Sequence, residues 1–196
     1  MSASLSLVRR RAPWRSALAL LALVCAFTGA LSPSGAMAGQ GATVLTVTGA
    51  VGASNRPPFE AFRDALFAAQ DQHFDKAYAF DRDMLAALPQ ESVRAEIEGW
   101  PKAVELKGPS LASVLRKAGV GESAELTLFA LDGYNVALAG EDRARYKWIL
   151  AIEAGGEPLA LGGRGPSWLV RDTGGSAATA DAESPMVWAL YHIKAE

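Results

Sequence analysis

Cysteine is almost absent from this sequence of 196 residues, and its single copy, Cys25, lies near the amino-terminal end. The region from Gly39 onward therefore has no disulfide, no thiol nucleophile and no thiolate ligand for a metal. Histidine is nearly as scarce, with His73 expected on the surface and His192 on the polar side of the last apolar segment. The two histidines lack metal-ligand and catalytic-relay spacing, and no serine lies in a Gly-x-Ser-x-Gly turn. We therefore expect no metal site and no catalytic residues.

Basic charge is also scarce once the first 38 residues are set aside. Those residues hold four of the 19 basic side chains and none of the 21 acidic ones. The remainder thus carries 15 basic and 21 acidic side chains, which is a formal charge of −6. Binding to phosphate backbones requires a basic surface, so we exclude nucleic acid as a partner.

The first 38 residues have the pattern of a secretory signal. Four arginines precede an apolar run over 17–31, and Ala36-Met37-Ala38 follows as a small-x-small cleavage site. A run of about fifteen residues is shorter than the roughly twenty that a membrane-spanning helix needs. We expect residues 1–38 to be removed and residues 39–196 to form one exported, soluble domain in the periplasm. The Arg-Arg pair can also direct export of a folded protein, but its flanking residues favour the ordinary unfolded route.

Hydropathy patterns in the rest of the chain indicate helices and strands in alternation. Apolar residues at helical spacing predict helices over 58–74, 81–88 and 110–118. Ser110 and Gly119 suit the N-cap and the left-handed terminator of the last of these helices. Alternating or continuous apolar segments predict strands over 44–49, 77–80, 93–97, 126–131, 134–138, 148–152 and 159–161, and two further apolar segments follow at 168–170 and 187–193.

Two turns indicate how the later strands pair. Asp132-Gly133 suits a tight hairpin between 126–131 and 134–138, because this dipeptide tolerates positive φ. A second hairpin is expected to join 148–152 and 159–161. Two hairpins in series predict an α+β fold with a mixed, mainly antiparallel sheet or barrel and a few short helices.

The glycine-rich segment Gly162-Gly163-Arg164-Gly165-Pro166 is the nearest approach to an anion-binding loop. It lacks the lysine and serine of a nucleotide-binding loop, so a tight turn between strands is the simpler interpretation. The alternative stays open because a guanidinium beside free backbone amides suits a planar or anionic ligand.

Four tryptophans follow the predicted signal. Trp148 and Trp188 lie within apolar segments, and we expect both in the core. Trp100 and Trp168 lie beside turns, where antiparallel folds often bind ligands, although a core position is also the favoured interpretation for them.

Several phrases, taken in order, resemble the sulfite-oxidase-type molybdopterin-binding domain, and in particular its small exported members. The resemblance covers roughly residues 43 to 194, nearly all of the region after the predicted signal, and implies that fold. It rests on Leu85-Ala86-Ala87-Leu88-Pro89, Lys107-Gly108-Pro109-Ser110-Leu111, Leu115-x-x-Ala118-Gly119, Ala130-Leu131-Asp132-Gly133-Tyr134, Ile149-Leu150-Ala151, Gly165-Pro166-Ser167-Trp168 and Val187-Trp188-Ala189-Leu190.

The sequence differs from the enzymes of that family at the residue that binds the metal. In the enzymes of that family a cysteine thiolate binds molybdenum, at a position that matches Glu98-Gly99-Trp100 here, where there is no cysteine. The sequence is more similar to a branch of periplasmic pterin-binding proteins that lack this cysteine and report to a membrane-bound cyclic-di-GMP enzyme. This likeness implies a non-catalytic sensor or carrier for a reduced pterin, with the periplasmic domain of a membrane signalling protein as its partner. A molybdopterin-dependent oxidoreductase or its subunit is the alternative, and a scaffold that binds only protein is a third.

The family's pocket implies a ligand site where the strand ending at Glu98 meets the Asp132 turn and the 162–168 loop. Trp100 or Tyr134 is expected to stack on the pterin ring, and Glu98 or Asp132 to accept hydrogen bonds from its aminopyrimidine edge. Arg164 is expected to bind a carbonyl or side-chain oxygen of the pterin. Competing interpretations are that Asp132 only makes the hairpin turn and that Trp100 only fills the core. The predicted ligand-binding residues are Glu98, Trp100, Asp132, Tyr134, Arg164 and Trp168.

Overall fold

A computed structural model of the chain describes residues 41–97, 102–174, 177–178 and 185–196. The chain divides into two units, Met1–Met37 and Ala38–Glu196, and every described residue belongs to the second. None of the helices within these ranges has the length and apolar character required to cross a membrane. The predicted signal lies outside the described residues and stays a prediction.

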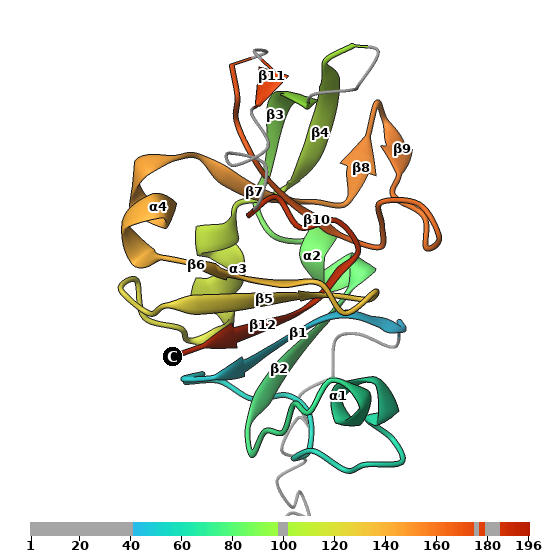
Figure 1. Ribbon diagram of the computed structural model, residues 1–196, viewed down its shortest axis with the longest axis vertical. Coiled ribbons are helices and arrows are strands. Elements are labelled where there is room, and N and C mark those ends of the chain that lie inside the picture. The colour runs from blue at the N-terminus through green and yellow to red at the C-terminus, as the bar shows by residue number, and fades with distance from the viewer. Residues whose placement is uncertain (1–40, 98–101, 175–176, 179–184) are drawn as a thin grey trace, which may run out of the picture. The chain divides into compact units, whose positions relative to one another are not determined.

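One sheet has five strands in the order β2-β1-β12-β5-β6 (Figure 1). The end of the chain is inserted into the middle of this sheet, because β12 runs parallel to β1 on one side and antiparallel to β5 on the other. The strands are β1 Thr43–Gly49, β2 Ala77–Asp81, β5 Leu126–Ala130, β6 Asn135–Leu138 and β12 Leu190–Ala195.

A second five-stranded sheet has the order β11-β3-β4-β8-β9, and β7 pairs with β10 separately. All strand pairs are antiparallel except β1 with β12 and β3 with β11. The predicted α+β class with mixed, mainly antiparallel sheets is confirmed, and in the part of the chain that the structure describes no sheet closes into a barrel. The strands are β3 Gln90–Ile97, β4 Val104–Pro109, β7 Trp148–Ala151, β8 Glu153–Ala154, β9 Glu157–Pro158, β10 Trp168–Arg171 and β11 Ala177–Ala178.

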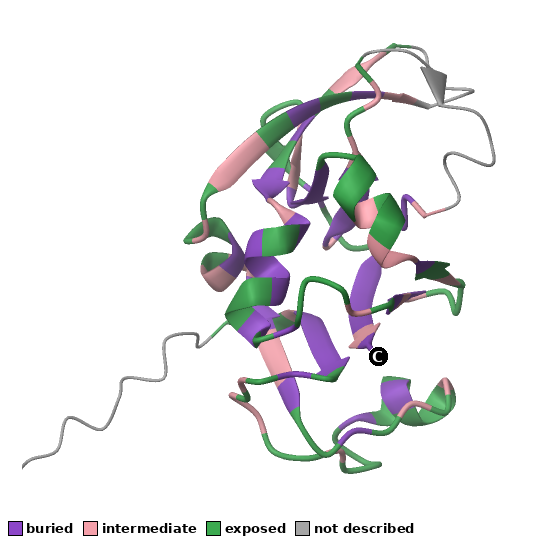
Figure 2. Ribbon diagram, turned by 90° about the vertical axis from the view of Figure 1, so that its left-hand side faces the viewer, coloured by how far each residue is buried: buried purple, intermediate pink, exposed green. Residues whose placement is uncertain are grey.

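Two of the predicted helices are confirmed, and local signals explain both. Helix α2, Arg82–Ala86, begins after Asp81, whose carboxylate accepts a hydrogen bond from the Met84 amide at 2.7 Å. Helix α3, Leu111–Ala118, begins after Ser110 and ends at Gly119, which has a left-handed φ of +73°. One face of α3 is buried and the other is exposed, as expected for an amphipathic helix on a sheet (Figure 2).

The predicted helix over 58–74 is wrong in extent, because only α1, Ala65–Ala69, is helical. Side chains satisfy the amides that a helix would have paired. The carboxylate of Glu60 accepts hydrogen bonds from the Phe62 and Arg63 amides, and Asp64 accepts one from the Glu60 amide. Acidic side chains that bind nearby amides in this way stabilise turns at the expense of helix.

The predicted hairpin of 148–152 with 159–161 forms only near its turn, where the Leu159 amide donates to the Ile152 carbonyl at 2.8 Å, and its extension along β7 is wrong. All four residues of β7 are buried, and their partner is β10, whose first three residues are buried, in register Leu150 to Leu169. The intervening Gly155-Gly156 turn joins only the short strands β8 and β9, and β9 is exposed. Strand β4 and helix α4, Gly140–Arg145, had no counterpart in the sequence prediction.

Candidate functional site

The six predicted ligand residues fall into three groups in the structure. Glu98 and Trp100 lie outside the described residues. Asp132 and Tyr134 form the β5–β6 turn, where the Asp132 carboxylate accepts a hydrogen bond from the Tyr134 amide at 2.9 Å. This bond and the φ of +92° at Gly133 show that Asp132 shapes the hairpin turn.

Arg164 and Trp168 belong to the loop before β10. Trp168 is only 2% exposed, and its indole N–H donates to the Met186 carbonyl at 3.3 Å, so its ring is part of the core. Arg164 is exposed, and its guanidinium carbon lies 5.0 Å from the centre of the Trp168 ring. Trp168 therefore presents almost no surface to a ligand. Its ring contacts the guanidinium of the exposed Arg164.

Ala189 brings the Arg164 loop and the Asp132 turn together. Its amide donates to the Arg164 carbonyl at 2.9 Å, and its own carbonyl accepts from the Leu131 amide at 3.0 Å. Ala189 has an uncommon left-handed φ of +50°, which allows it to bridge the two loops. The structure therefore joins two of the segments that the sequence predicted to form the site.

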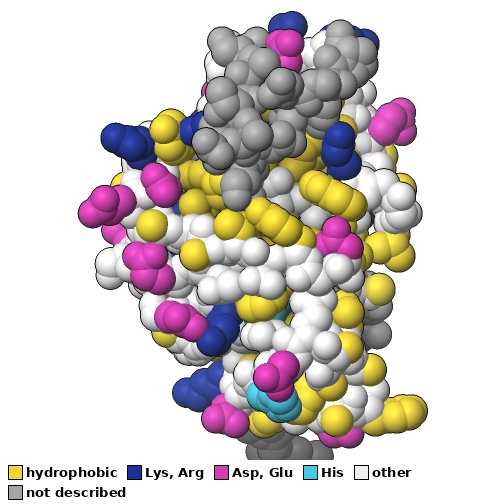
Figure 3. Space-filling view, in the orientation of Figure 1, with side chains coloured by type: hydrophobic (Ala, Val, Ile, Leu, Met, Phe, Trp, Pro, Cys, Tyr) yellow, Lys and Arg dark blue, Asp and Glu magenta, His cyan; other side chains and the backbone are white. Residues whose placement is uncertain are grey.

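Trp188, beside this bridge, was expected in the core, and that expectation is wrong. Its neighbours Val187 and Ala189 are buried, whereas Trp188 itself is 45% exposed. The segment crosses the front of Figure 1 before it enters β12, and Figure 3 shows hydrophobic side chains gathered on this face. The alternation of inward and outward residues was hidden in the sequence because the outward residue is also apolar.

A cavity of about 490 Å³ adjoins both loops and is lined by Leu131 and Pro166 from them. Its volume is in the range that binds small organic molecules. The other walls come from β1, from the segment before and within α1, from β2 and from β12. They consist of Thr43, Val44, Thr46, Arg56, Pro57, Arg63, Asp64, Leu66, Phe67, Ala79 and Tyr191.

An ion-pair cluster centred on Asp64 forms the polar wall of this cavity. Its carboxylate is almost fully buried and accepts from Arg56 Nη2, from Arg63 Nη2 at 2.9 Å and from the Glu60 amide at 2.9 Å. Burial acts to raise the pKa of Asp64, but these hydrogen bonds outweigh it and hold the pKa below its ordinary value. The carboxylate is therefore ionised and holds both guanidinium groups in place.

Arg56 is the more buried of the two cations and has donors to spare. Its Nη1 donates to Thr46 Oγ1 at 3.3 Å, and its guanidinium lies 4.9 Å from the centre of the Phe74 ring. The hydrogen bonds to Thr46 and Asp64 use two of the five N–H groups that a guanidinium offers. Its other N–H groups have no hydrogen-bond partner among the described residues, and such groups can bind a ligand carbonyl or ring nitrogen.

Tyr191 adds an unused polar group to a mainly aromatic wall. It packs edge-on against Phe67, with ring centres 5.2 Å apart, in a cluster that also contains Phe74 and Phe129. Its enclosed hydroxyl has no hydrogen-bond partner among the described residues. Burial raises the pKa of Tyr191 to about 12, so the hydroxyl is a neutral donor at physiological pH. An unmade buried hydrogen bond costs about 1–3 kcal/mol, which an acceptor on a ligand would recover.

Sequence reasoning missed three polar residues that line this cavity, Arg56, Asp64 and Tyr191. The predicted helix over 58–74 separated the first two, and their ion pair forms only because the chain turns between them. Tyr191 lay inside an apolar run with no signal of its own. Its position beside Phe67 depends on the insertion of β12 into the sheet.

The cavity combines hydrogen-bonding groups with aromatic and apolar surface. Guanidinium, tyrosine hydroxyl and threonine groups beside aromatic and apolar side chains match a flat heterocycle with several acceptors and donors. Among the described ranges no group of three or more histidine, cysteine, aspartate or glutamate side chains is placed to bind a metal. The sole cysteine of the sequence is Cys25, which lies outside the described residues, so no cysteine thiolate is found in the part of the chain that the structure describes.

Comparisons with known proteins give distant structural likenesses and no match by sequence. No family model matches the chain, and no curated protein matches it. Among solved structures it is similar to the sulfane dehydrogenase SoxCD from Paracoccus pantotrophus, with 17% identity and a TM-score of 0.49. The match covers 77% of this chain but only 37% of the SoxCD chain.

Proposed function

We propose that this protein binds a reduced pterin, without catalysing a reaction, in the cavity between the Asp64 cluster and the two loops joined by Ala189. The observation that carries the proposal is the pairing, in one cavity, of the partly unused Arg56 guanidinium with the unpartnered Tyr191 hydroxyl. Both groups donate hydrogen bonds, and the carbonyl and ring nitrogens of a pterin accept them. Two lining residues, Leu131 and Pro166, come from the loops that carry the predicted residues Asp132 and Arg164.

The proposed contacts follow from this distribution of donors and apolar surfaces. The carbonyl edge of the pterin faces Arg56 and Tyr191, and its rings lie against the apolar wall of Leu131 and Pro166. The hydroxyl of Thr43, in the same cavity, offers an acceptor for an amino group. Binding rather than catalysis is proposed because the thiolate that holds molybdenum in the enzymes of the resembled family is missing.

The same proposal places the protein in the periplasm, where it reports pterin binding to the periplasmic domain of a membrane-bound cyclic-di-GMP enzyme. Support for a protein partner comes from apolar side chains exposed on or near the two loops. Trp188 and Tyr134 are each 45% exposed, and Leu161 is 73% exposed. Exposed apolar groups of this size are typical of surfaces that a partner covers.

Calorimetric titration of the exported protein with 6-methyltetrahydropterin tests the pterin site. We expect one site per chain, and we expect Tyr191→Phe to weaken binding about tenfold, as for one lost hydrogen bond. The matched control Tyr146→Phe removes a hydroxyl from an exposed tyrosine outside this cavity and should bind like the parent. Equal affinity in all three proteins would contradict the assignment of the cavity.

Two further measurements separate this proposal from its alternatives. Asp132→Asn keeps the oxygen that accepts from the Tyr134 amide, so the turn should persist. A loss of about a hundredfold in pterin affinity would then place the pterin's aminopyrimidine edge at Asp132, as the family resemblance implies. Metal analysis of natively exported protein addresses the oxidoreductase alternative, since stoichiometric molybdenum would favour that alternative over a sensor.

A further inference from the structure

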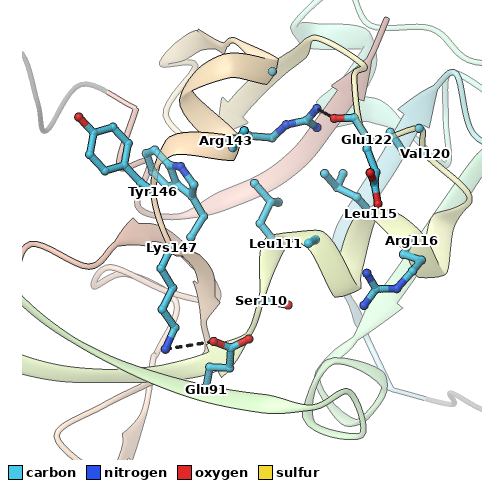
Figure 4. A pocket seen from close by; sticks show the side chains of 15 residues that line it. Glu91, Ser110, Leu111, Leu115, Arg116, Val120, Glu122, Arg143, Tyr146 and Lys147 are labelled. Atoms are coloured by element: carbon cyan, nitrogen blue, oxygen red, sulfur yellow. Dashed lines mark hydrogen bonds and ion pairs between the residues drawn. The ribbon is translucent and has the colours of Figure 1, made fainter.

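A second cavity, of about 450 Å³, lies between α3 and α4 and shares no lining residue with the cavity described above. We call it the α3–α4 groove. Its floor is apolar, and its rim carries three cations and two carboxylates (Figure 4). The floor contains Leu111, Leu115, Val120 and Trp148, and the charged rim consists of Glu91, Arg116, Glu122, Arg143 and Lys147.

Arg143 is the half-buried cation of the rim, and most of its N–H groups lack acceptors among the described residues. In the described part of the chain its side chain makes one hydrogen bond, from Nη2 to the Glu122 carbonyl. Its Nη1 is enclosed and has no partner among the described residues. Burial lowers the pKa of Arg143, and the charge of Glu125 only partly opposes this effect. A guanidinium offers five N–H groups, so this one is a cation short of acceptors.

The charges of the rim favour binding of an anion in the groove. Lys147 and Glu91 neutralise one another, with Nζ and Oε2 3.0 Å apart. Arg116, which also lines the groove, is exposed and has no side-chain partner among the described residues (Figure 4). Within the described ranges, one carboxylate of the groove, Glu122, forms no ion pair. Two cations of the groove, Arg116 and Arg143, form none either, so the unpaired charges sum to one positive charge.

We propose that the α3–α4 groove binds a small amphipathic carboxylate. Its aliphatic or aromatic body lies on Leu111, Leu115 and Trp148, and its carboxylate accepts hydrogen bonds from the Arg143 guanidinium. A guanidinium and a carboxylate form paired, charge-assisted hydrogen bonds, which supply the acceptors that Arg143 lacks. The apolar body provides the remaining affinity because it is removed from water on the buried floor. This site is independent of the proposed pterin site.

Three ligands of equal length test the proposal by calorimetric titration of the exported protein. Octanoate carries the required charge, octanol carries none, and octylamine carries the opposite one. We expect octanoate to bind at least tenfold more tightly than octanol, and octylamine to bind more weakly than both. Equal binding of octanoate and octanol would overturn the role of the charge.

Matched variants locate the site. Arg143→Met should weaken octanoate binding at least tenfold and leave octanol binding unchanged, whereas Arg145→Met, on the same helix but outside the groove, should change neither. Ala144→Phe fills the groove from an exposed position and should weaken both ligands, which keeps the test decisive if Arg143→Met does not fold. Octanoate binding that survives Arg143→Met or Ala144→Phe, or that is lost in Tyr191→Phe instead, would overturn the proposal.

Discussion

Thr48 and His192 form a buried hydrogen bond between the parallel strands β1 and β12, with Oγ1 and Nε2 2.7 Å apart. His192 is 1% exposed and its ring stacks on Phe129, with ring centres 4.7 Å apart. Its Nδ1 has no hydrogen-bond partner among the described residues. The expectation that His192 lies on a polar side of its strand is therefore wrong. Burial, with a smaller effect from Lys194, lowers the pKa of this histidine to about 3.

The free energy of unfolding should fall as the pH is lowered from 6.5 toward 3. In this pH range His192 is protonated in the unfolded state but neutral in the folded state, so acid favours unfolding. The loss is about 1.4 kcal/mol per pH unit, or about 2 kcal/mol between pH 6.5 and pH 5. Urea unfolding at the two pH values measures it. His192→Gln should remove most of this pH dependence. The control His73→Gln, at an exposed site, should retain it. An equal dependence of the unfolding free energy on pH in both variants would contradict the assignment to His192.

Arg56 and Arg63 both bind Asp64, but their loss should have different consequences. Arg56→Met leaves the buried carboxylate without its more buried partner and should lower the free energy of unfolding by about 3 kcal/mol. The Arg63 side chain is 43% exposed, so Arg63→Met should cost under about 1 kcal/mol. Chemical unfolding of the two variants gives the comparison, and equal losses would show that burial does not determine the strength of these pairs.

Tyr191→Phe should stabilise the protein while it weakens pterin binding. The substitution removes a buried hydroxyl with no hydrogen-bond partner among the described residues, and the free energy of unfolding should rise by about 1 kcal/mol. Residues kept for binding often lower stability in this way. Thermal melts with and without the pterin separate the two effects. A destabilised variant would mean that the hydroxyl already has a partner in the folded protein.

Gly108 should not tolerate a side chain. A Cβ atom at this position in β4 would lie 1.9 Å from the backbone carbonyl oxygen of Leu150 in β7, so one of the two strands must move. We expect Gly108→Ala to lower the free energy of unfolding by about 3 kcal/mol or to prevent folding. Gly121→Ala, where no atom lies within 4 Å of the added carbon, should change it by no more than about 0.5 kcal/mol. Similar melting temperatures for both variants would refute the close packing of β4 on β7.

Elements with a local signal were predicted well, and elements with distant partners were not. The bounds of α3 follow from Ser110 and Gly119, and the β5–β6 hairpin follows from Asp132-Gly133. The pairing of β7 with β10 and the extent of α1 could not be predicted. The β7–β10 pairing depends on two buried strands that lie far apart in the sequence. The extent of α1 depends on acidic side chains that accept hydrogen bonds from amides within a turn.

For the candidate site, the sequence by itself indicated that the Asp132 turn and the Arg164 loop belong together, through the family resemblance, and it established that no thiolate follows Cys25. Only the tertiary structure placed Arg56 and Tyr191 in one cavity beside those loops. The physical reason is the range of the interactions. Caps and tight turns are hydrogen bonds between residues a few positions apart, which a sequence pattern records directly. The cavity wall requires β12 to enter the sheet beside β1, and burial of apolar surface, which has no direction along the chain, decides that arrangement.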